Sequence, residues 1–428
     1  MSALALYLKG EGKIVCGSDP AQNDICNNLK ENGIKVFGTH SANNITSDID
    51  LVIYSLAIKE DNPELARAKS LNVPCIKRGV ALAQIAEDYE HTIAVAGTHG
   101  KTTTTAMIYH IFKECGKTPT VHIGGQIGDN KQNIIVGDKE FFITEACEYG
   151  DSYLHLRPEV SIINNIEKEH LDYFGSLKNV YASYNKFMLY SKKCFVGSKC
   201  KNKIITLAQD YFGKGSDSYA ANIKCNAIGC EFDAFINKEF YGRVALKVLG
   251  EHSIHNCLGA IKVADYYGLN RTKVIEALKT FANAKRRFEY MGRWKNCAVI
   301  FDYAHHPTEI KSSLTAAKKA YKNDIYVFFQ PHTYSRTKTL IREFSRCFCA
   351  AKAVFVCDTY KAREKYDKAG DAKALSSAIR AGGINNVLQG SIEDIVKYLN
   401  NFGAEGTLLF IGAGDMQDNL LKKITFTN

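Results

Sequence analysis

Residues 92–108 constrain the fold of this chain more than any other part of the sequence. The apolar, β-branched segment 92–96 runs into a glycine turn at 97–100, and Lys101 with a row of threonines then opens a helical segment. A strand, a glycine turn and a helix N-terminus in this order gather backbone N–H groups and an ammonium around one point, where a polyphosphate can bind. The pattern therefore predicts an α/β domain that binds a nucleoside triphosphate, with Thr102 placed to help hold Mg²⁺.

The turn departs from the usual phosphate-loop pattern at one position. That pattern has a glycine five residues before Gly100, where this chain has Val95. A polar glycine turn that only caps a helix is the structural alternative, but the strand, lysine and hydroxyls together favour phosphate binding. The predicted triphosphate-binding residues of the turn are Gly97, Thr98, His99, Gly100, Lys101, Thr102 and Thr103.

Length and composition limit the classes of protein to consider. The 428 residues exceed what one hydrophobic core supports, and 46% hydrophobic and 23% charged residues are ordinary for a globular chain. No stretch approaches the roughly 20 apolar residues that span a bilayer, and the apolar start lacks the features of a signal peptide. The net charge of +10 suits acidic ligands such as nucleotides, but it is not gathered into the basic runs of a nucleic-acid-binding protein. The fourteen cysteines contain no Cys-x-x-Cys, so we expect free thiols and a cytoplasmic protein without a membrane or nucleic-acid partner.

Apolar strands alternate with helical segments along the whole chain, which predicts mainly parallel sheets with flanking helices. We place three α/β domains at residues 1–88, 89–285 and 286–428, the first and last Rossmann-like and the middle one a P-loop ATPase domain. A Rossmann-like unit normally opens with a strand and a glycine-rich loop, whereas this sequence begins inside the helix that follows them, so the first strand is expected to be missing. The predicted strands are 13–19, 34–38, 51–55, 92–96, 140–145, 160–165, 298–302, 324–329, 353–356 and 406–411.

Acidic and imidazole side chains follow two strands of the middle domain. Glu145 and Glu148 lie at and just after one strand end, where carboxylates can hold a metal directly or through water. A solvated surface pair is the alternative. His170 follows the next strand in an acidic loop, and the nearby phosphate loop gives metal binding the same weight as a packing or surface role.

Further candidates lie beyond this region. His252 and Asn256 are four residues apart, just before an apolar helix expected at 257–267, and share a helical face that could contact an adenine edge. Helix capping by Ser253 explains part of this segment equally well. Asp302, His305 and His306 follow a strand, with Pro307 as the first residue of the next helix, and suit a substrate or proton-transfer site. A metal site is the alternative there, although no third strong ligand is nearby. Candidate anion clamps, unless they are ordinary surface arginines, are Arg286, Arg287 and Arg336.

Taken together, these motifs resemble those of the Mur ligase family over nearly the whole chain, from Met1 to about Gln417. Within that family they are most similar to the members that act on UDP-N-acetylmuramate and L-alanine. The motifs that carry the resemblance are 97–103, 145–149, 165–170, 250–252 with Asn256, 286–289, 302–309, 330–337 and 412–415.

The resemblance implies a UDP-sugar domain, an ATPase domain and an amino-acid domain. It also implies a cytoplasmic, ATP- and Mg²⁺-dependent ligase of peptidoglycan synthesis, needed for cell shape and division and acting as a monomer or weak homodimer. Such an enzyme joins L-alanine to the carboxylate of UDP-N-acetylmuramate through an acyl phosphate. A related ligase that uses a peptide or another amino acid, and an ATP-binding but ligase-inactive truncated form, remain open.

The resemblance also assigns roles by motif. Lys101 contacts the terminal phosphates, Thr102 and Glu145 hold a first Mg²⁺, and His170 holds a second. The adenine contacts are His252 and Asn256, the further nucleotide contacts are Arg287 and Asp302, and the amino-acid contacts are His305, His306 and Arg336. The catalytic residues implied are Lys101, Glu145, His170, Arg287 and Asp302.

The chain departs from the family pattern at several positions. Ser253 replaces a usual Asn beside the adenine His, Thr333 replaces a frequent Arg, and Glu169 replaces a usual Asp. Lys186 is roughly where related ligases carry a carbamylated lysine, but we expect a surface residue there. The start, 1–5, resembles the tail of the family's glycine-rich turn, so we expect roughly ten preceding residues, most simply lost to a misassigned start; a true truncation would weaken nucleotide-sugar binding.

Overall fold

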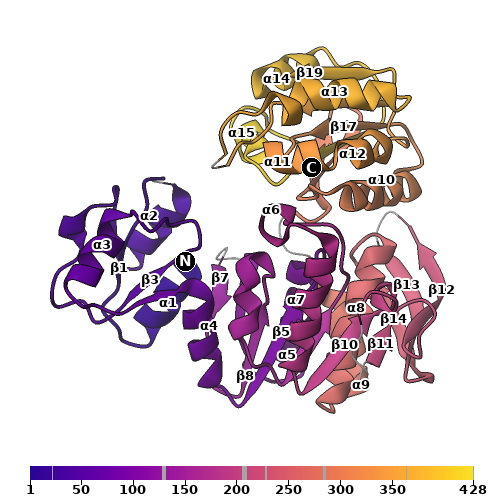
Figure 1. Ribbon diagram of the computed structural model, residues 1–428. Coiled ribbons are helices and arrows are strands. Elements are labelled where there is room, and N and C mark those ends of the chain that lie inside the picture. The colour runs from indigo at the N-terminus through magenta and orange to yellow at the C-terminus, as the bar shows by residue number, and fades with distance from the viewer. Residues whose placement is uncertain are drawn as a thin grey trace. The chain divides into compact units, whose positions relative to one another are not determined.

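The computed structural model describes residues 1–21, 23–127, 132–204, 210–226, 229–282, 286–362 and 364–427. It confirms an α/β fold of three domains with mainly parallel sheets and flanking helices (Figure 1). Contacts between residues divide the chain into two compact units. Across the described ranges, no helix has the length and apolar character needed to cross a membrane. The first unit comprises 1–219, 235–239 and 256–277, and the second comprises 220–234, 240–255 and 278–428.

The N-terminal domain has two short, separate parallel strand pairs, β1–β2 and β3–β4. The three strands predicted here are present, each shorter than expected, and β4 was not predicted. The asparagines before α2 and α3 accept hydrogen bonds from the first helical N–H groups, which is why these helices begin there. That an opening strand is missing from this domain stays a prediction. The elements are α1 (Ser2–Gly10), β1 (Cys16–Ser18), α2 (Asp24–Glu31), β2 (Lys35–Phe37), β3 (Val52–Tyr54), α3 (Pro63–Ser70), β4 (Cys75–Lys77) and α4 (Arg78–Glu87).

The middle domain is built on a seven-stranded sheet with the strand order β11-β10-β9-β5-β8-β6-β7. All neighbours are parallel except β6 and β7, and the inner strands are almost fully buried, as expected for a parallel sheet covered on both faces. Because β5 is central, the turn that follows it lies at the middle of the sheet's carboxyl edge. The strands are β5 (His91–Ala96), β6 (Thr120–Ile127), β7 (Gln132–Ile135), β8 (Phe141–Glu145), β9 (Val160–Ile163), β10 (Lys193–Gly197) and β11 (Asp210–Phe212), and the helices include α5 (Lys101–Glu114), α6 (Leu171–Phe174), α7 (Leu177–Leu189), α8 (Glu251–Tyr266) and α9 (Arg271–Thr280).

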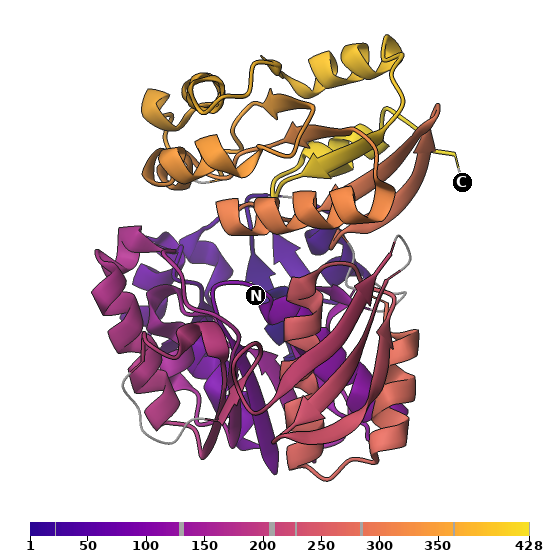
Figure 2. The ribbon, with the colours of Figure 1, turned by 90° about the vertical axis from the view of Figure 1, so that its right-hand side faces the viewer.

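A three-stranded sheet of β12 (Tyr219–Cys225), β13 (Cys230–Ile236) and β14 (Glu239–Leu246) was not predicted; it faces the viewer in Figure 2. It also corrects the expectation of free thiols, because Cys225 and Cys230 form a disulfide. The two residues flank a short hairpin loop in which the Asn226 N–H donates to the Gly229 carbonyl at 2.9 Å, and their Cα atoms lie 4.1 Å apart. The other twelve cysteines are free thiols.

The C-terminal domain has a six-stranded sheet with the order β15-β16-β20-β17-β18-β19, parallel except for β15. Its four predicted strands are confirmed, and apolar side chains form a separate core on each of its faces. The elements are β15 (Glu289–Trp294), β16 (Cys297–Asp302), α10 (Pro307–Tyr321), β17 (Ile325–Phe329), α11 (Tyr334–Thr339), α12 (Ile341–Cys347), β18 (Ala353–Cys357), α13 (Ala372–Ala381), β19 (Val387–Gly390), α14 (Ile392–Asn400), β20 (Thr407–Ile411) and α15 (Met416–Leu421).

A buried histidine in the seven-stranded sheet of the middle domain is expected to make the folded protein less stable at low pH. His122 lies on β6 beside the Thr144 hydroxyl at 2.9 Å, and burial, together with the charges of Arg78 and the N-terminal amine, lowers its pKa to about 3. The unfolded chain, with an ordinary histidine pKa of about 6.5, binds a proton that the folded state excludes. Stability is therefore lost as pH falls from about 6.5 towards 3, by at most about 1.4 kcal/mol per pH unit from this group.

We expect His122→Gln to remove this contribution, because glutamine keeps a hydrogen-bonding group but does not titrate. Urea midpoints measured at pH 7, 5 and 4 should fall less steeply for the variant than for the wild type. Parallel pH dependences of the two proteins would contradict the prediction.

Candidate active site

The strand–turn–helix unit predicted from the sequence is present. Strand β5 ends at Ala96, and α5 begins at Lys101 with Gly100 as its N-cap. Gly97 has φ +133° and Gly100 has φ +81°, a region that favours glycine. The turn therefore presents the N-terminus of a 14-residue helix at the centre of the sheet's carboxyl edge, a position suited to a phosphate group.

Two asparagines after β9 hold this turn in place; the sequence analysis included them in a predicted strand and, for Asn165, in a family motif, but assigned neither a role. The Asn165 side chain accepts from the His99 N–H at 2.8 Å and donates to the His99 carbonyl at 3.0 Å. Asn164 donates to the Thr104 hydroxyl at 3.0 Å. The signal that could have found them is their position at the carboxyl end of the strand next to β5, where side chains reach the turn.

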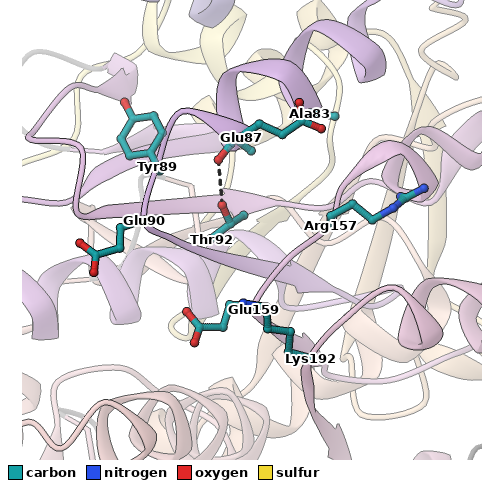
Figure 3. A pocket seen from close by; sticks show the side chains of 9 residues that line it. Ala83, Glu87, Tyr89, Glu90, Thr92, Arg157, Glu159 and Lys192 are labelled. Carbon is teal, nitrogen blue, oxygen red and sulfur yellow. Dashed lines mark hydrogen bonds between the residues drawn. The ribbon is translucent and has the colours of Figure 1, made fainter.

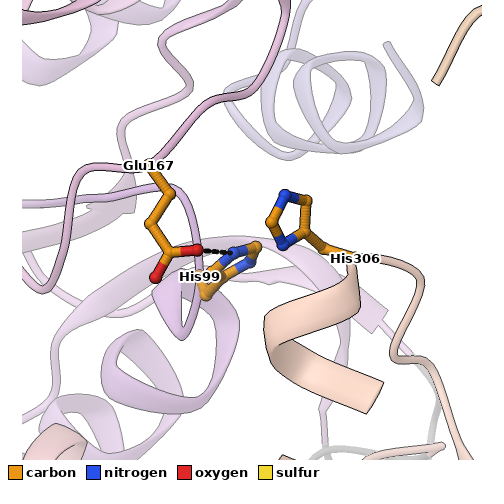
Figure 4. Close-up of side chains that lie close together, drawn as sticks. All are labelled: His99, Glu167 and His306. Carbon is orange, nitrogen blue, oxygen red and sulfur yellow. Dashed lines mark ion pairs between the residues drawn. The ribbon is translucent and has the colours of Figure 1, made fainter. Parts of the chain in front are cut away.

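His99 of the turn also pairs with an acid of the following loop. Its Nε2 lies 3.5 Å from a carboxylate oxygen of Glu167 (Figure 4). The Thr98 hydroxyl also accepts from the Glu167 N–H at 2.9 Å. The loop after β9 is thus tied to the phosphate turn by both backbone and side-chain contacts.

Lys101 is folded back over its own turn. Its Nζ lies 2.5 Å from the Gly97 carbonyl oxygen, 3.3 Å from the Thr98 carbonyl oxygen, and 3.0 and 3.2 Å from the two carboxylate oxygens of Glu148. Burial alone would lower the pKa of Lys101, but the nearby acidic groups, Glu148 foremost among them, together outweigh it, and the pKa lies above its ordinary value. The side chain is therefore a cation largely shielded from solvent, at the point where the sequence predicts phosphate.

The predicted metal ligands Thr102 and Glu145 meet a pair of glycines on β6. The Gly124 N–H donates to the Glu145 carboxylate at 2.8 Å, and a Cβ on Gly124 would come within 2.9 Å of that carboxylate. A Cβ on Gly125 would come within 2.8 Å of the Thr102 methyl. The glycines thus leave room for the Thr102 side chain and the Glu145 carboxylate beside the turn. The oxygens that these two residues carry are hard donors of the kind that fits Mg²⁺.

His170, predicted to hold a second cation, lies beside Glu148. Its Nε2 is 3.9 Å from Glu148 Oε1, and its ring is 5.0 Å from that of Tyr149. His170 has φ +54° and precedes α6. Glu148 is 2% exposed, so the reading of this residue as a solvated acid is wrong.

Asn256 of α8 also contacts the phosphate turn. A Cβ on Gly100 would come within 2.5 Å of Asn256 Oδ1, so the amide packs directly against the glycine. His252 lies in the first turn of α8, its ring over Gly250. The sequence alternative that Ser253 caps this helix is wrong. Ser253 lies inside α8, and its hydroxyl donates to the Leu249 carbonyl at 2.9 Å.

In the C-terminal domain, Asp302 ends β16 and is buried. Its carboxylate accepts a short hydrogen bond from the Ser313 hydroxyl of α10, and burial raises its pKa above the ordinary value. The Arg287 guanidinium lies 4.0 Å from the Glu309 carboxylate and over the Tyr303 ring. Asp302 and Arg287 are thus gathered at the carboxyl edge of this sheet.

The two histidines after Asp302 differ in their contacts. His306 is the N-cap of α10, its Nδ1 accepting from the Thr308 N–H at 3.3 Å, and Glu309 completes the capping box. His305 Nδ1 lies 3.6 Å from the Glu309 carboxylate, and the His305 ring lies 6.2 Å from that of His332. Pro307 is the first residue of α10, as predicted.

The remaining arginine candidates are held by backbone carbonyls. Arg336 donates to the His332 carbonyl at 2.5 Å and lies 2.9 Å from His332 Nδ1. Arg286 donates to the Gln417 side chain at 2.6 Å and to the Gly414 carbonyl at 2.9 Å, which is a structural role in the C-terminal loops. Lys186 is exposed on α7, as expected of a surface residue.

The N-terminal domain holds a polar cluster that the sequence analysis missed. The Ser18 hydroxyl, at the carboxyl end of β1, donates to Glu64 at 2.6 Å and lies 2.8 Å from His40 Nδ1. Asn44 donates to the same carboxylate at 2.7 Å. Groups of this kind at a sheet's carboxyl edge suit a hydroxyl-rich ligand.

A separate cavity of about 210 Å³ lies at the opposite, amino-terminal edge of the central sheet (Figure 3). It is lined by Glu159, Arg157 and Lys192 before β9 and β10, among others. The phosphate turn follows the carboxyl end of β5, so this cavity is not part of the candidate site.

Gly100→Ala provides a test of the turn. The added Cβ would meet the Asn256 amide at 2.5 Å while the backbone stays at a left-handed φ, so the turn must shift. We expect nucleotide affinity to fall at least about tenfold, measured by calorimetry. Gly116→Ala, also at positive φ but with nothing within 4 Å, is the matched control, and equal losses in both variants would contradict the assignment.

Comparison with known families gives three consecutive matches. They are Mur ligase family, catalytic domain, at residues 1–90; Mur ligase middle domain, at 95–264; and Mur ligase, glutamate ligase domain, at 286–414. The UDP-N-acetylmuramate–L-alanine ligase of Clostridium perfringens is 39% identical, over 97% of this chain and 93% of the relative. The enzyme of the same name from Acetivibrio thermocellus is 38% identical, over 97% of this chain and 91% of the relative.

Solved structures show the same similarity. The UDP-N-acetylmuramate-alanine ligase of Thermotoga maritima matches with a TM-score of 0.83 at 28% identity, covering 99% of this chain and 95% of its own. A murein peptide ligase of Psychrobacter arcticus has a TM-score of 0.70 at 22% identity, covering 99% and 96%, which shows a shared fold.

Proposed function

We propose that this chain, which belongs to the Mur ligase family, joins L-alanine to UDP-N-acetylmuramate in peptidoglycan synthesis. The observation that carries the proposal is the full-length similarity to relatives of that name, at 39% identity over 97% of the chain. The phosphate turn with Lys101, Thr102 and Glu145 supports it, because these are the groups that phosphoryl transfer requires.

The proposed reaction has two steps. The sugar carboxylate attacks the terminal phosphorus of ATP, which forms an acyl phosphate and releases ADP. The amine of L-alanine then attacks the acyl carbon, an amide forms, and phosphate leaves with the proton going to solvent or a base. Phosphoryl transfer depends mainly on positioning and charge neutralisation, which the helix N-terminus and the Lys101 ammonium supply.

We propose that Thr102 and Glu145 hold one Mg²⁺ and that His170 holds a second. When bound, Mg²⁺ would neutralise charge between ATP and the sugar carboxylate. The fit rests on the Glu145 carboxylate beside Gly124 and on the Thr102 side chain, which packs against Gly125.

The remaining roles are proposed as the family resemblance implies them. His252, Asn256, Arg287 and Asp302 contact the nucleotide, and His305, His306 and Arg336 serve the amino acid. The polar cluster around Glu64 supports a sugar-nucleotide site in the N-terminal domain. Domain boundaries near 88 and 285, a cytoplasmic location and a monomer or weak homodimer complete the proposal.

Substrate-dependent ADP formation tests the function. We expect turnover only when ATP, Mg²⁺, UDP-N-acetylmuramate and L-alanine are all present. Activity with a tripeptide but not with L-alanine would assign a related ligase instead. ATP binding without turnover that depends on the nucleotide sugar would indicate a ligase-inactive form.

A further inference from the structure

Glu148 is the acid in closest contact with Lys101, and neither the proposed reaction steps nor the proposed Mg²⁺ sites use it. An ammonium has three N–H donors, and Lys101 faces four oxygen acceptors: two backbone carbonyls and both oxygens of Glu148. The Lys101 donors are therefore fully used within the protein. A phosphate can engage Nζ only if one of these contacts is released.

Of these contacts, the one to Glu148 is the most direct competitor for phosphate. The carboxylate side chain is 3% exposed, so little water screens it from the ammonium. It also carries the same charge sign as a phosphate, so a triphosphate that approaches Lys101 is repelled by it. The carbonyls of Gly97 and Thr98 belong to the turn itself and carry no net charge.

On its other side, Glu148 lies next to His170. The 3.9 Å between His170 Nε2 and Glu148 Oε1 places the carboxylate between the lysine and the histidine proposed to hold a cation. If the Glu148 carboxylate left Lys101, it would therefore still lie beside His170, where we propose that the second cation binds.

We propose that Glu148 is a positioning residue that competes with nucleotide phosphates for the Lys101 ammonium. When phosphate takes the ammonium, Glu148 releases it and turns its charge towards the His170 side of the site. The residue thereby makes phosphate binding unfavourable unless a divalent cation accompanies it. This inference rests on the proposed function, since it concerns the same ATP site.

The sign of the effect separates competition from a merely structural role. Glu148→Gln removes both the competing charge and its repulsion of phosphate, so binding of Mg²⁺-free ATP should become at least about tenfold tighter. With Mg²⁺ present, the cation already offsets the carboxylate, and the gain should shrink to about threefold or less. A residue that only supports the turn would, when changed, weaken ATP binding in both conditions.

The experiment is calorimetric titration of ATP into the full chain, once in EDTA and once in excess Mg²⁺. Glu148→Gln is compared with the wild type and with Glu114→Gln, which removes the same charge from the exposed far end of α5. We expect tighter Mg²⁺-free binding in Glu148→Gln alone. Unchanged or weaker Mg²⁺-free binding, or an equal gain in Glu114→Gln, would overturn the inference.

A second variant covers a possible loss of folding. Glu148→Asp keeps the charge but withdraws it from Lys101 by one methylene, and should tighten Mg²⁺-free binding to a smaller extent. If Glu148→Gln fails to fold, this variant decides, and no gain in it overturns the inference. If wild-type protein binds no ATP at all, the proposed function itself fails, whereas normal ligase turnover without the Glu148 effect refutes only the competition.

Discussion

Lys101→Ala is expected to lower kcat/KM for ATP by at least about two orders of magnitude, as when one charge contact to a transition state is removed. The physical reason is the position of its ammonium, which lies over the turn at the N-terminus of α5 and is largely shielded from solvent. Initial rates of ADP formation at saturating sugar nucleotide and L-alanine measure the effect. Lys113→Ala, which removes an exposed lysine from the last turn of the same helix, should leave the rate unchanged.

Lys101→Arg sharpens this test. The planar guanidinium is larger than an ammonium and cannot occupy the same contacts with the Gly97 carbonyl and Glu148. We therefore expect a loss close to that of the alanine variant. Substantial activity in either variant would mean that the phosphates bind elsewhere.

Glu145→Ala is expected to have the second-largest effect, a loss of about a hundredfold in kcat together with a higher Mg²⁺ requirement. The carboxylate lies at the end of β8 and is oriented by the Gly124 N–H at 2.8 Å, so its removal takes away an oriented oxygen donor beside Thr102. Rates measured across a series of Mg²⁺ concentrations would show both changes.

The control lies beside the same strand. Glu140→Ala, just before β8, removes an acid that pairs with Lys117 at 2.6 Å and is 34% exposed. It should leave the Mg²⁺ dependence unaltered. If excess Mg²⁺ has no influence on the Glu145→Ala defect and the two variants behave alike, Glu145 does not serve the cation.

The sequence predicted the strand–turn–helix unit well because the information is local. A strand, its turn and the next helix are consecutive in the chain, so residues 92–108 alone define the unit. The same holds for Pro307 as the first residue of α10. Parallel strands with continuous apolar residues were recognisable for a similar reason.

Contacts between strands that are distant in the sequence could not be predicted in this way. The approach of Gly124 and Gly125 to Glu145 and Thr102 depends on the pairing of β6 with β8, which no local pattern contains. The hold of Asn165 on His99 likewise depends on the pairing of β9 with β5. Polar residues at strand ends indicated where to look, but not which atoms would meet.

The disulfide was missed because spacing rules for metal and redox motifs do not describe hairpins. Cys225 and Cys230 are five residues apart, at the facing ends of the neighbouring strands β12 and β13, and this pairing brings them together. In the C-terminal domain, by contrast, the sequence predicted where the residues lie but not what surrounds them. There the sequence placed Asp302 and His306 correctly at one sheet edge, but not the burial of the first or the capping contact of the second.

The Cys225–Cys230 bridge has a practical consequence for work with the purified protein. Samples kept with a thiol reductant and samples left in air would differ by two hydrogen atoms in intact mass, and by a closed or open loop at the hairpin tip. A preparation handled without control of its oxidation would therefore contain two chemical species. Crystals or titrations from such a mixture would average over both, so the choice of reductant should be fixed before any of the variants are compared.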